Sequence, residues 1–166
     1  TLEHVHASGL LQFSASKAHG KTLLGLGIDA LVWSALGERR PIQRIVADQS
    51  PQVIPPLPAE QARVRLRALA GIVSTAATMP LPFMPKAGYA WFRRAPGDAA
   101  WKAASDQWNT RDGHGEGDDA WVRLALRGRD PFLDSNQESV ELFQQLATDI
   151  FQAMPGVDPA SGPADD

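Results

Sequence analysis

Hydrophobic positions come in blocks along this chain, and the first block, residues 18–36, ends at Gly37. This pattern predicts a helix with a glycine stop. Ser14 and Ser16 precede the block, and either side chain can cap the first turn. Three glycines inside the block lower its helix propensity by roughly 1 kcal/mol each relative to alanine, but they also permit close packing. Residues 1–13 predict no more than a short strand or an irregular lead-in.

Two further blocks have the period of an α-helix. Over residues 58–79, one helical face carries Ala62, Leu66, Leu69, Ala70 and Val73. Pro80 prevents the helix from continuing. The last block follows a capping box at residues 135–138, and its apolar side chains recur at helical spacing over residues 140–154.

Shorter runs predict strands. Residues 41–48 and 52–57 flank a turn-like segment and predict a hairpin, although their prolines limit both strands to edges or ends. The aromatic run at residues 89–92 is compatible with a further strand. Short helices are predicted over residues 98–108 and 120–126, on either side of a polar, glycine-rich loop.

No internal repeat and no linker divides the chain. One domain is therefore expected over residues 1–155, followed by a disordered tail at residues 156–166 that is rich in proline, glycine, alanine and aspartate. Because the chain begins at Thr1 and not at methionine, we expect it to be a piece of a longer protein.

Composition excludes several classes of protein. The 166 residues are 43% hydrophobic and 21% charged, which is globular composition. The net charge of −3 argues against a freestanding nucleic-acid binder but allows a local basic patch. The absence of cysteine excludes disulfides, cysteine–zinc sites and thiol nucleophiles. No apolar run is long enough for a membrane-spanning helix, and we expect residues 1–15 not to be a secretory signal, because they lack a basic segment followed by an apolar one.

The sequence offers little catalytic chemistry. His4 and His6 have a spacing that zinc can use, but no third ligand is near. His114 stands in the glycine-rich loop near Glu116 and two aspartates, but this spacing matches no calcium loop, and a solvated helix cap is favoured. No nucleophile elbow or Walker A loop is present. The sequence predicts no catalytic residue, no metal ligand and no cofactor.

The five tryptophans are candidates for binding DNA or another protein. They are Trp33, Trp91, Trp101, Trp108 and Trp121. Trp91 lies two residues after Tyr89 and is followed by Phe92, Arg93 and Arg94. Interleaved aromatic and basic side chains can stack bases and hold phosphates, or they can form a contact with another subunit. We favour a core or protein interface over DNA at these residues.

Three stretches together resemble a known family. They are residues 14–36, residues 56–91 and the motif Gly115, Glu116, Gly117, Asp118, Asp119, Ala120, Trp121. They look like the C-terminal region of the exodeoxyribonuclease V gamma chain, the RecC family. The resemblance covers roughly residues 8–155, and the motif is its most specific part.

The resemblance implies a soluble, cytoplasmic piece of a larger subunit. That subunit works with a nuclease–helicase beta subunit and, in many bacteria, a helicase alpha subunit. The complex is an ATP-dependent exodeoxyribonuclease and helicase, a hydrolase that processes DNA ends in repair and recombination. The implied fold is α/β, a degenerate restriction-endonuclease-like fold of the PD-(D/E)XK type, with a small sheet and flanking helices.

The residues agree with a loss of nuclease activity. An active relative needs an acid on one hairpin strand and an acid-x-lysine pattern on the next, to hold a metal. The second strand here reads Val53, Ile54, Pro55, Pro56, Leu57, and Asp48 alone cannot hold a metal. We read the Gly115–Trp121 motif as structural, with Asp118 and Asp119 capping a helix and Trp121 anchoring its buried side.

Two alternatives stay open. One is an active metal-dependent nuclease built on His114, Glu116, Asp118 and Asp119. The other is a direct DNA-binding module that uses Arg93 and Arg94.

Overall fold

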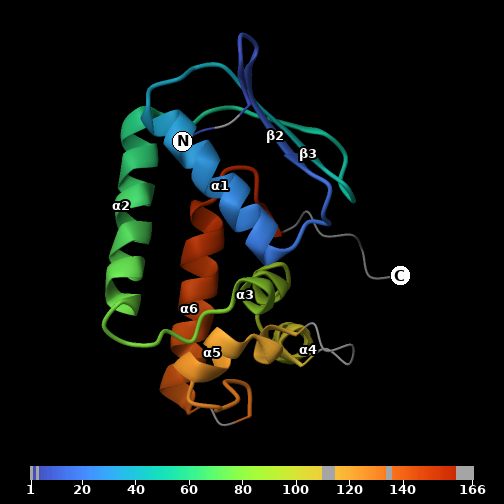
Figure 1. Ribbon diagram of the computed structural model, residues 1–166, viewed down its shortest axis with the longest axis vertical. Coiled ribbons are helices and arrows are strands. Elements are labelled where there is room, and N and C mark those ends of the chain that lie inside the picture. The colour runs from blue at the N-terminus through green and yellow to red at the C-terminus, as the bar shows by residue number, and fades with distance from the viewer. Residues whose placement is uncertain (1, 3, 110–114, 134–135, 160–166) are drawn as a thin grey trace. The chain divides into compact units, whose positions relative to one another are not determined.

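The computed structural model describes residues 2, 4–109, 115–133 and 136–159 (Figure 1). The chain divides into two compact units. The first unit comprises residues 1–73 and 152–157, and the second comprises residues 74–151 and 158–166. The prediction of a single domain over residues 1–155 stays a prediction, and most of the predicted tail, residues 160–166, lies outside the described residues.

The first unit holds a four-stranded mixed sheet. Its strands are β1 (Val5–His6), β2 (Gly9–Ser14), β3 (Ile42–Val46) and β4 (Gln52–Ile54), and they lie in that order. β2 and β3 are parallel and run side by side in Figure 1, whereas the other two pairs are antiparallel. The predicted β3–β4 hairpin is confirmed, with strands shorter than the runs because proline cannot donate to the ladder.

Helix α1 (Gly20–Ala35) connects the two parallel strands, as a crossover between parallel neighbours requires. The predicted helix and its stop are confirmed, since Gly37 has φ +83°. The predicted serine cap is wrong. The Nδ1 atom of His19 accepts a hydrogen bond from the backbone N–H of Thr22 at 3.3 Å, so His19 caps the helix.

A short apolar row forms the core under the sheet. Leu10, Ile42 and Ile54 are direct neighbours across β2, β3 and β4, and they pack with Trp33 and Ala30 of α1. This row fixes the register, because a slip by one residue would turn it to the opposite face of the sheet.

Helix α2 (Ala59–Ala76) confirms the second predicted helix but not all of its predicted buried face. Ala62 is fully buried, and Leu66 and Leu69 are half-buried. Ala70 and Val73 are exposed. Helical period alone therefore marks more of this face as buried than the structure covers.

The second unit is helical. It contains α3 (Pro85–Phe92), α4 (Asp98–Trp108), a short 3-10 turn (Glu116–Asp118) and α5 (Ala120–Ala125). The helices expected over residues 98–108 and 120–126 are confirmed. The compatible strand over residues 89–92 is wrong, because these residues lie in α3.

The reason for this error is visible in the burial of α3. Pro85 stands in its first turn, where its fixed φ suits a helix. Five of its eight residues are buried, and among them Gly88, Trp91 and Phe92 have the i, i+3, i+4 spacing of one helical face; the other two are Ala87 and Tyr89. Packing of this helical face therefore overrides the β propensity of the aromatic side chains.

Helix α6 (Gln137–Ala153) confirms the last predicted helix, with Phe143, Leu146, Ala147, Ile150 and Phe151 buried. The Oδ1 atom of Asn136 accepts a hydrogen bond from the backbone N–H of Ser139 at 2.9 Å and caps it. Ser135, the predicted cap, lies outside the described residues. In the part of the chain that the structure describes, no helix is long and apolar enough to cross a bilayer.

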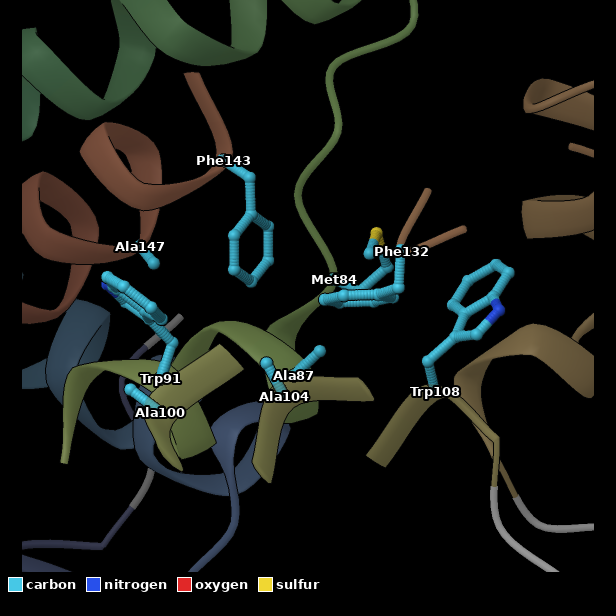
Figure 2. Packing of buried hydrophobic residues seen from close by; sticks show 9 residues of the cluster. All are labelled: Met84, Ala87, Trp91, Ala100, Ala104, Trp108, Phe132, Phe143 and Ala147. Carbon is cyan, nitrogen blue, oxygen red and sulfur yellow. The ribbon is translucent and has the colours of Figure 1, made fainter. Parts of the chain in front are cut away.

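Aromatic rings and alanines build the core of the second unit. Figure 2 shows Trp91, Phe132 and Phe143 among Ala87, Ala100, Ala104 and Ala147. The Trp101 ring meets those of Trp91 and Phe143 edge-on, at centroid distances of 6.5 and 5.9 Å. Small alanines let helices approach closely, and the rings fill the remaining volume.

Residues 152–157 return to the first unit and pack against α1. A Cβ atom added at Gly27 would meet the Cβ of Met154 at 2.8 Å. At Gly25 it would meet nothing within 4 Å. Close packing therefore explains the glycine at Gly27 but not the one at Gly25.

We expect Gly27→Ala to lower the free energy of unfolding by about 1–3 kcal/mol, because it overpacks the Met154 contact. The matched change Gly25→Ala should raise it by up to about 1 kcal/mol through helix propensity. Urea denaturation followed by circular dichroism measures both. Equal effects of the two substitutions would contradict the close contact.

Candidate functional site

Strands β2, β3 and β4 carry a polar row on the face of the sheet that holds the apolar core. Gln12 of β2 lies directly opposite Arg44 of β3, and Arg44 lies directly opposite Gln52 of β4. Partners opposite each other in a sheet point to the same face. Gln12 and Arg44 are buried, with 4% and 1% of their surfaces exposed. We call these three residues the Gln–Arg–Gln row.

Arg44 is held by neutral groups. Its Nε donates to the Oε1 of Gln12 at 2.9 Å, and its Nη1 donates to the carbonyl oxygen of Gly156 at 3.4 Å. The Nε2 of Gln12 in turn donates to the carbonyl oxygen of Leu26 at 2.6 Å. The Nη2 of Arg44 and the Oε1 of Gln52 are buried, and neither has a partner among the described residues.

The electrostatics of the row oppose metal binding. Desolvation lowers the pKa of the Arg44 guanidinium from its ordinary value to about 10, so it stays charged at neutral pH. No carboxylate pairs with it in the described part of the chain. A divalent cation needs anionic oxygens, and a fixed buried positive charge repels it.

Asp48, the acid nearest the hairpin turn, binds a backbone N–H group. Its Oδ1 accepts a hydrogen bond from the backbone N–H of Ala18 at 2.7 Å. The described residues hold no group of three or more His, Cys, Asp or Glu side chains that could bind a metal ion.

Glu116 of the Gly115–Trp121 motif is buried, with 4% of its surface exposed. Its Oε1 accepts from the backbone N–H of Lys86 and its Oε2 from that of Ala87, each at 2.9 Å. These N–H groups belong to the first turn of α3, whose N-cap residue, Met84, makes no side-chain cap. Glu116 therefore supplies both the missing acceptors and a negative charge at the positive end of the helix.

The aspartates of the motif also bind backbone groups. Asp118 accepts from the N–H of Gly115 through Oδ2 at 3.1 Å. Asp119 accepts from the N–H groups of Trp121 and Val122 through Oδ1, at 2.9 and 3.3 Å, and caps α5. His114 lies outside the described residues.

In the same motif, Gly117 is in close contact with the core, whereas Trp121 is exposed. A Cβ atom at Gly117 would meet the Cε2 of Trp108 at 2.8 Å, so this position is confined to glycine by a close contact. Trp121 is 79% exposed, and the prediction that it anchors the buried side of its helix is wrong. Val122 and Leu126 pack against the core instead.

The structure separates the aromatic and basic residues near Trp91. Tyr89 and Trp91 are each 5% exposed and point into the core. Arg93 is half-buried, with its guanidinium 5.5 Å from the centroid of the Tyr89 ring, and Arg94 is exposed. The core interpretation accounts for both rings. A contact of these four residues with DNA or a partner subunit stays a prediction.

Sequence reasoning missed Arg44 and the remote cap by Glu116. A signal for Arg44 was present, because Ile42, Arg44 and Val46 alternate with more exposed positions and so share the buried face. No sequence signal joins Glu116 to α3, since 30 residues separate it from Lys86.

We expect Gln12→Leu to lower the free energy of unfolding by about 2–3 kcal/mol, because it leaves the charged Nε–H of Arg44 buried without an acceptor. Arg44→Met removes the buried charge but leaves the Oε1 of buried Gln12 without its donor, so it should lower the free energy of unfolding by about 1 kcal/mol. The double variant should therefore be more stable than Gln12→Leu alone. Denaturant unfolding of the four proteins measures this coupling, and additive effects would contradict it.

The contribution of Arg44 to the free energy of unfolding depends on pH with the sign expected for a buried cation. Because the pKa of Arg44 is lower in the folded than in the unfolded state, its burial opposes folding below pH 10. That cost falls as the pH rises above about 10, toward the higher pKa of the unfolded state. The double variant lacks this contribution.

The comparisons with known proteins identify the chain. A family model described as the RecC C-terminal domain matches residues 1–96. This match spans the whole sheet, α1, α2 and α3, while the Gly115–Trp121 motif lies beyond it. No curated protein matches the chain. A match over more than half of the residues shows the family: the chain belongs to the RecC C-terminal domain family, which ties it to exodeoxyribonuclease V.

Proposed function

We propose that this chain is a non-catalytic structural and DNA-guiding domain of the gamma subunit of exodeoxyribonuclease V. That helicase–nuclease complex processes double-strand DNA ends for recombinational repair. The observation that supports the proposal is the Gln–Arg–Gln row: a buried cation and two amides lie on the strands that, in the proposed fold, would carry metal-binding acids in an active nuclease.

The proposed fold is a degenerate restriction-endonuclease-like fold. A mixed sheet supports it, with parallel strands β2 and β3 joined through α1 and with β3 continuing into a hairpin. We also propose residues 1–155 as the domain and residues 156–166 as its tail.

An active nuclease built on the second unit is less well supported. It would need free carboxylate oxygens on Glu116, Asp118 and Asp119. Each of these side chains instead accepts hydrogen bonds from backbone N–H groups. A metal would have to displace these contacts and uncap α3 and α5, which is costly. We therefore assign the Gly115–Trp121 motif a structural role.

The proposed partners are the nuclease–helicase beta subunit, the helicase alpha subunit where one exists, and DNA ends bound by the complex in the cytoplasm. The outer face of the sheet supports a partner contact. Phe13, Ile45 and Val53 are 65%, 40% and 72% exposed there. Large apolar side chains gathered on one face are typical of protein interfaces.

We expect the purified chain to leave end-labelled linear DNA intact in the presence of Mg²⁺ or Mn²⁺, because no described cluster can hold the metal. Gel electrophoresis measures the cleavage. Calorimetric titration with each ion should give no saturable heat.

The variants Asp118→Asn and Asp119→Asn test the alternative directly, and Asp98→Asn, which changes an exposed acid of α4, is the matched control. Robust cleavage by the parent chain, abolished by either test substitution and retained by the control, would overturn the proposal.

A further inference from the structure

An exposed aromatic and basic surface lies on α5 and the turn that follows it, a segment coloured orange in Figure 1. Trp121 is 79% exposed, while each of the other four tryptophans is buried or half-buried. Arg123, Arg127 and Arg129 are exposed on the same short segment. We call these four residues the Trp121 surface. Exposing so large a ring to water is unfavourable, so an exposed tryptophan indicates a surface that a ligand or partner covers.

The charge of this segment is entirely positive. Residues 120–129 contain three arginines and no acid. None of their guanidinium groups makes a hydrogen bond or ion pair with any described residue. The acids on either side are engaged. Asp119 caps α5, and the Oδ1 of Asp130 accepts from the N–H groups of Phe132 and Leu133 at 2.8 and 3.2 Å.

A hollow adjoins this surface within the second unit. Its volume is about 490 Å³, and its apolar lining includes Pro82, Pro131 and Leu142. Arg127 and Arg129, which follow α5, also line it, and so do the acids Asp130 and Glu138. Ala125, another lining residue, is one helical turn from Trp121 and shares its face.

We propose that the Trp121 surface binds single-stranded nucleic acid. A flat, exposed indole can stack on an unpaired base, and unpaired guanidinium groups can contact the phosphates beside it. The adjoining hollow, lined in part by Pro82, Pro131 and Leu142, has room for a neighbouring base. An intact duplex would not offer these rings, because its bases are stacked inside. The inference rests on the proposed DNA-guiding function and names the residues that would perform it.

This surface differs from the one that the sequence suggested. The Tyr89 and Trp91 rings are in the core, so their residues offer a strand only the two arginines that follow. Trp121 offers both an exposed ring and arginines. The two surfaces can be compared by substitution.

The test is fluorescence anisotropy of a 5′-labelled 15-mer of deoxythymidine, titrated with the 166-residue chain at low salt in EDTA. Trp121→Ala should weaken binding by roughly tenfold, because base–aromatic stacking is lost. Trp121→Phe, which keeps an aromatic ring, should retain most of the affinity. Since Trp121 is exposed, neither change should alter the circular dichroism spectrum.

The arginines are tested through the salt dependence. Each of Arg123→Ala, Arg127→Ala and Arg129→Ala should reduce the slope of log affinity against log salt by about 0.7, the value for one phosphate contact on a single strand. The matched control is the double change Arg63→Ala, Arg67→Ala on α2, where both arginines pair with Glu60. It should leave the slope unchanged.

Trp121 also supplies a direct optical readout. It should dominate acrylamide quenching of the intrinsic fluorescence, and the oligonucleotide should protect it. Absence of oligonucleotide binding, as for a surface made for protein, would overturn the inference. So would undiminished binding by Trp121→Ala, or an equal loss in the α2 control.

Failure of the inference and failure of the proposed function are distinguishable. The binding assay contains no divalent metal, so it does not depend on nuclease chemistry. Metal-dependent cleavage would overturn the non-catalytic role even if the Trp121 surface binds the oligonucleotide.

Discussion

The burial of one guanidinium constrains the first unit of this protein. Arg44 cannot leave its charge unsolvated in the core, so its neighbours must supply acceptors. Gln12 gives one across the parallel pair of strands, and the carbonyl of Gly156 gives another from the returning C-terminal segment. Gly156 has φ +71°, and a Cβ atom there would lie 3.1 Å from the Nη1 of Arg44. The charge, the sheet register and the path of this segment therefore depend on each other.

The same segment is held by a second arginine. The Nη1 of Arg65, on α2, donates to the carbonyl oxygens of Gln152 and Ala153, at 3.4 and 3.0 Å. Cations at the last carbonyls of a helix satisfy orphan acceptors and complement its dipole. In the second unit, Glu116 performs the converse task at the first turn of α3. Arg65 and Glu116 thus bind the backbone at helix ends, which supports a structural role for these two side chains.

Much of the fold could be predicted from the sequence, because hydrophobic periodicity and the glycines and prolines that end helices are local signals. The α1 helix and its stop at Gly37 are examples. The strand suggested at Tyr89–Phe92 failed because aromatic β propensity is weak against packing in a helical core. The prediction that Trp121 is buried was wrong for a related reason, since hydrophobicity alone does not say which side of a short helix is covered. The lack of an acid in residues 52–57 can be read directly from the sequence. The contacts of Arg44 cannot, because they depend on residues up to 112 positions away.

The central claim is that a buried, charged and hydrogen-bonded arginine replaces a metal site in the hairpin. The most direct test is the nuclear magnetic resonance signal of the Arg44 Nε–H, recorded with ¹⁵N labelling at neutral pH. We predict that this signal is protected from exchange with water, and that Gln12→Leu removes the protection. Added Mg²⁺ should leave it unmoved. Rapid exchange in the parent chain, or a saturable shift on addition of Mg²⁺, would contradict the account.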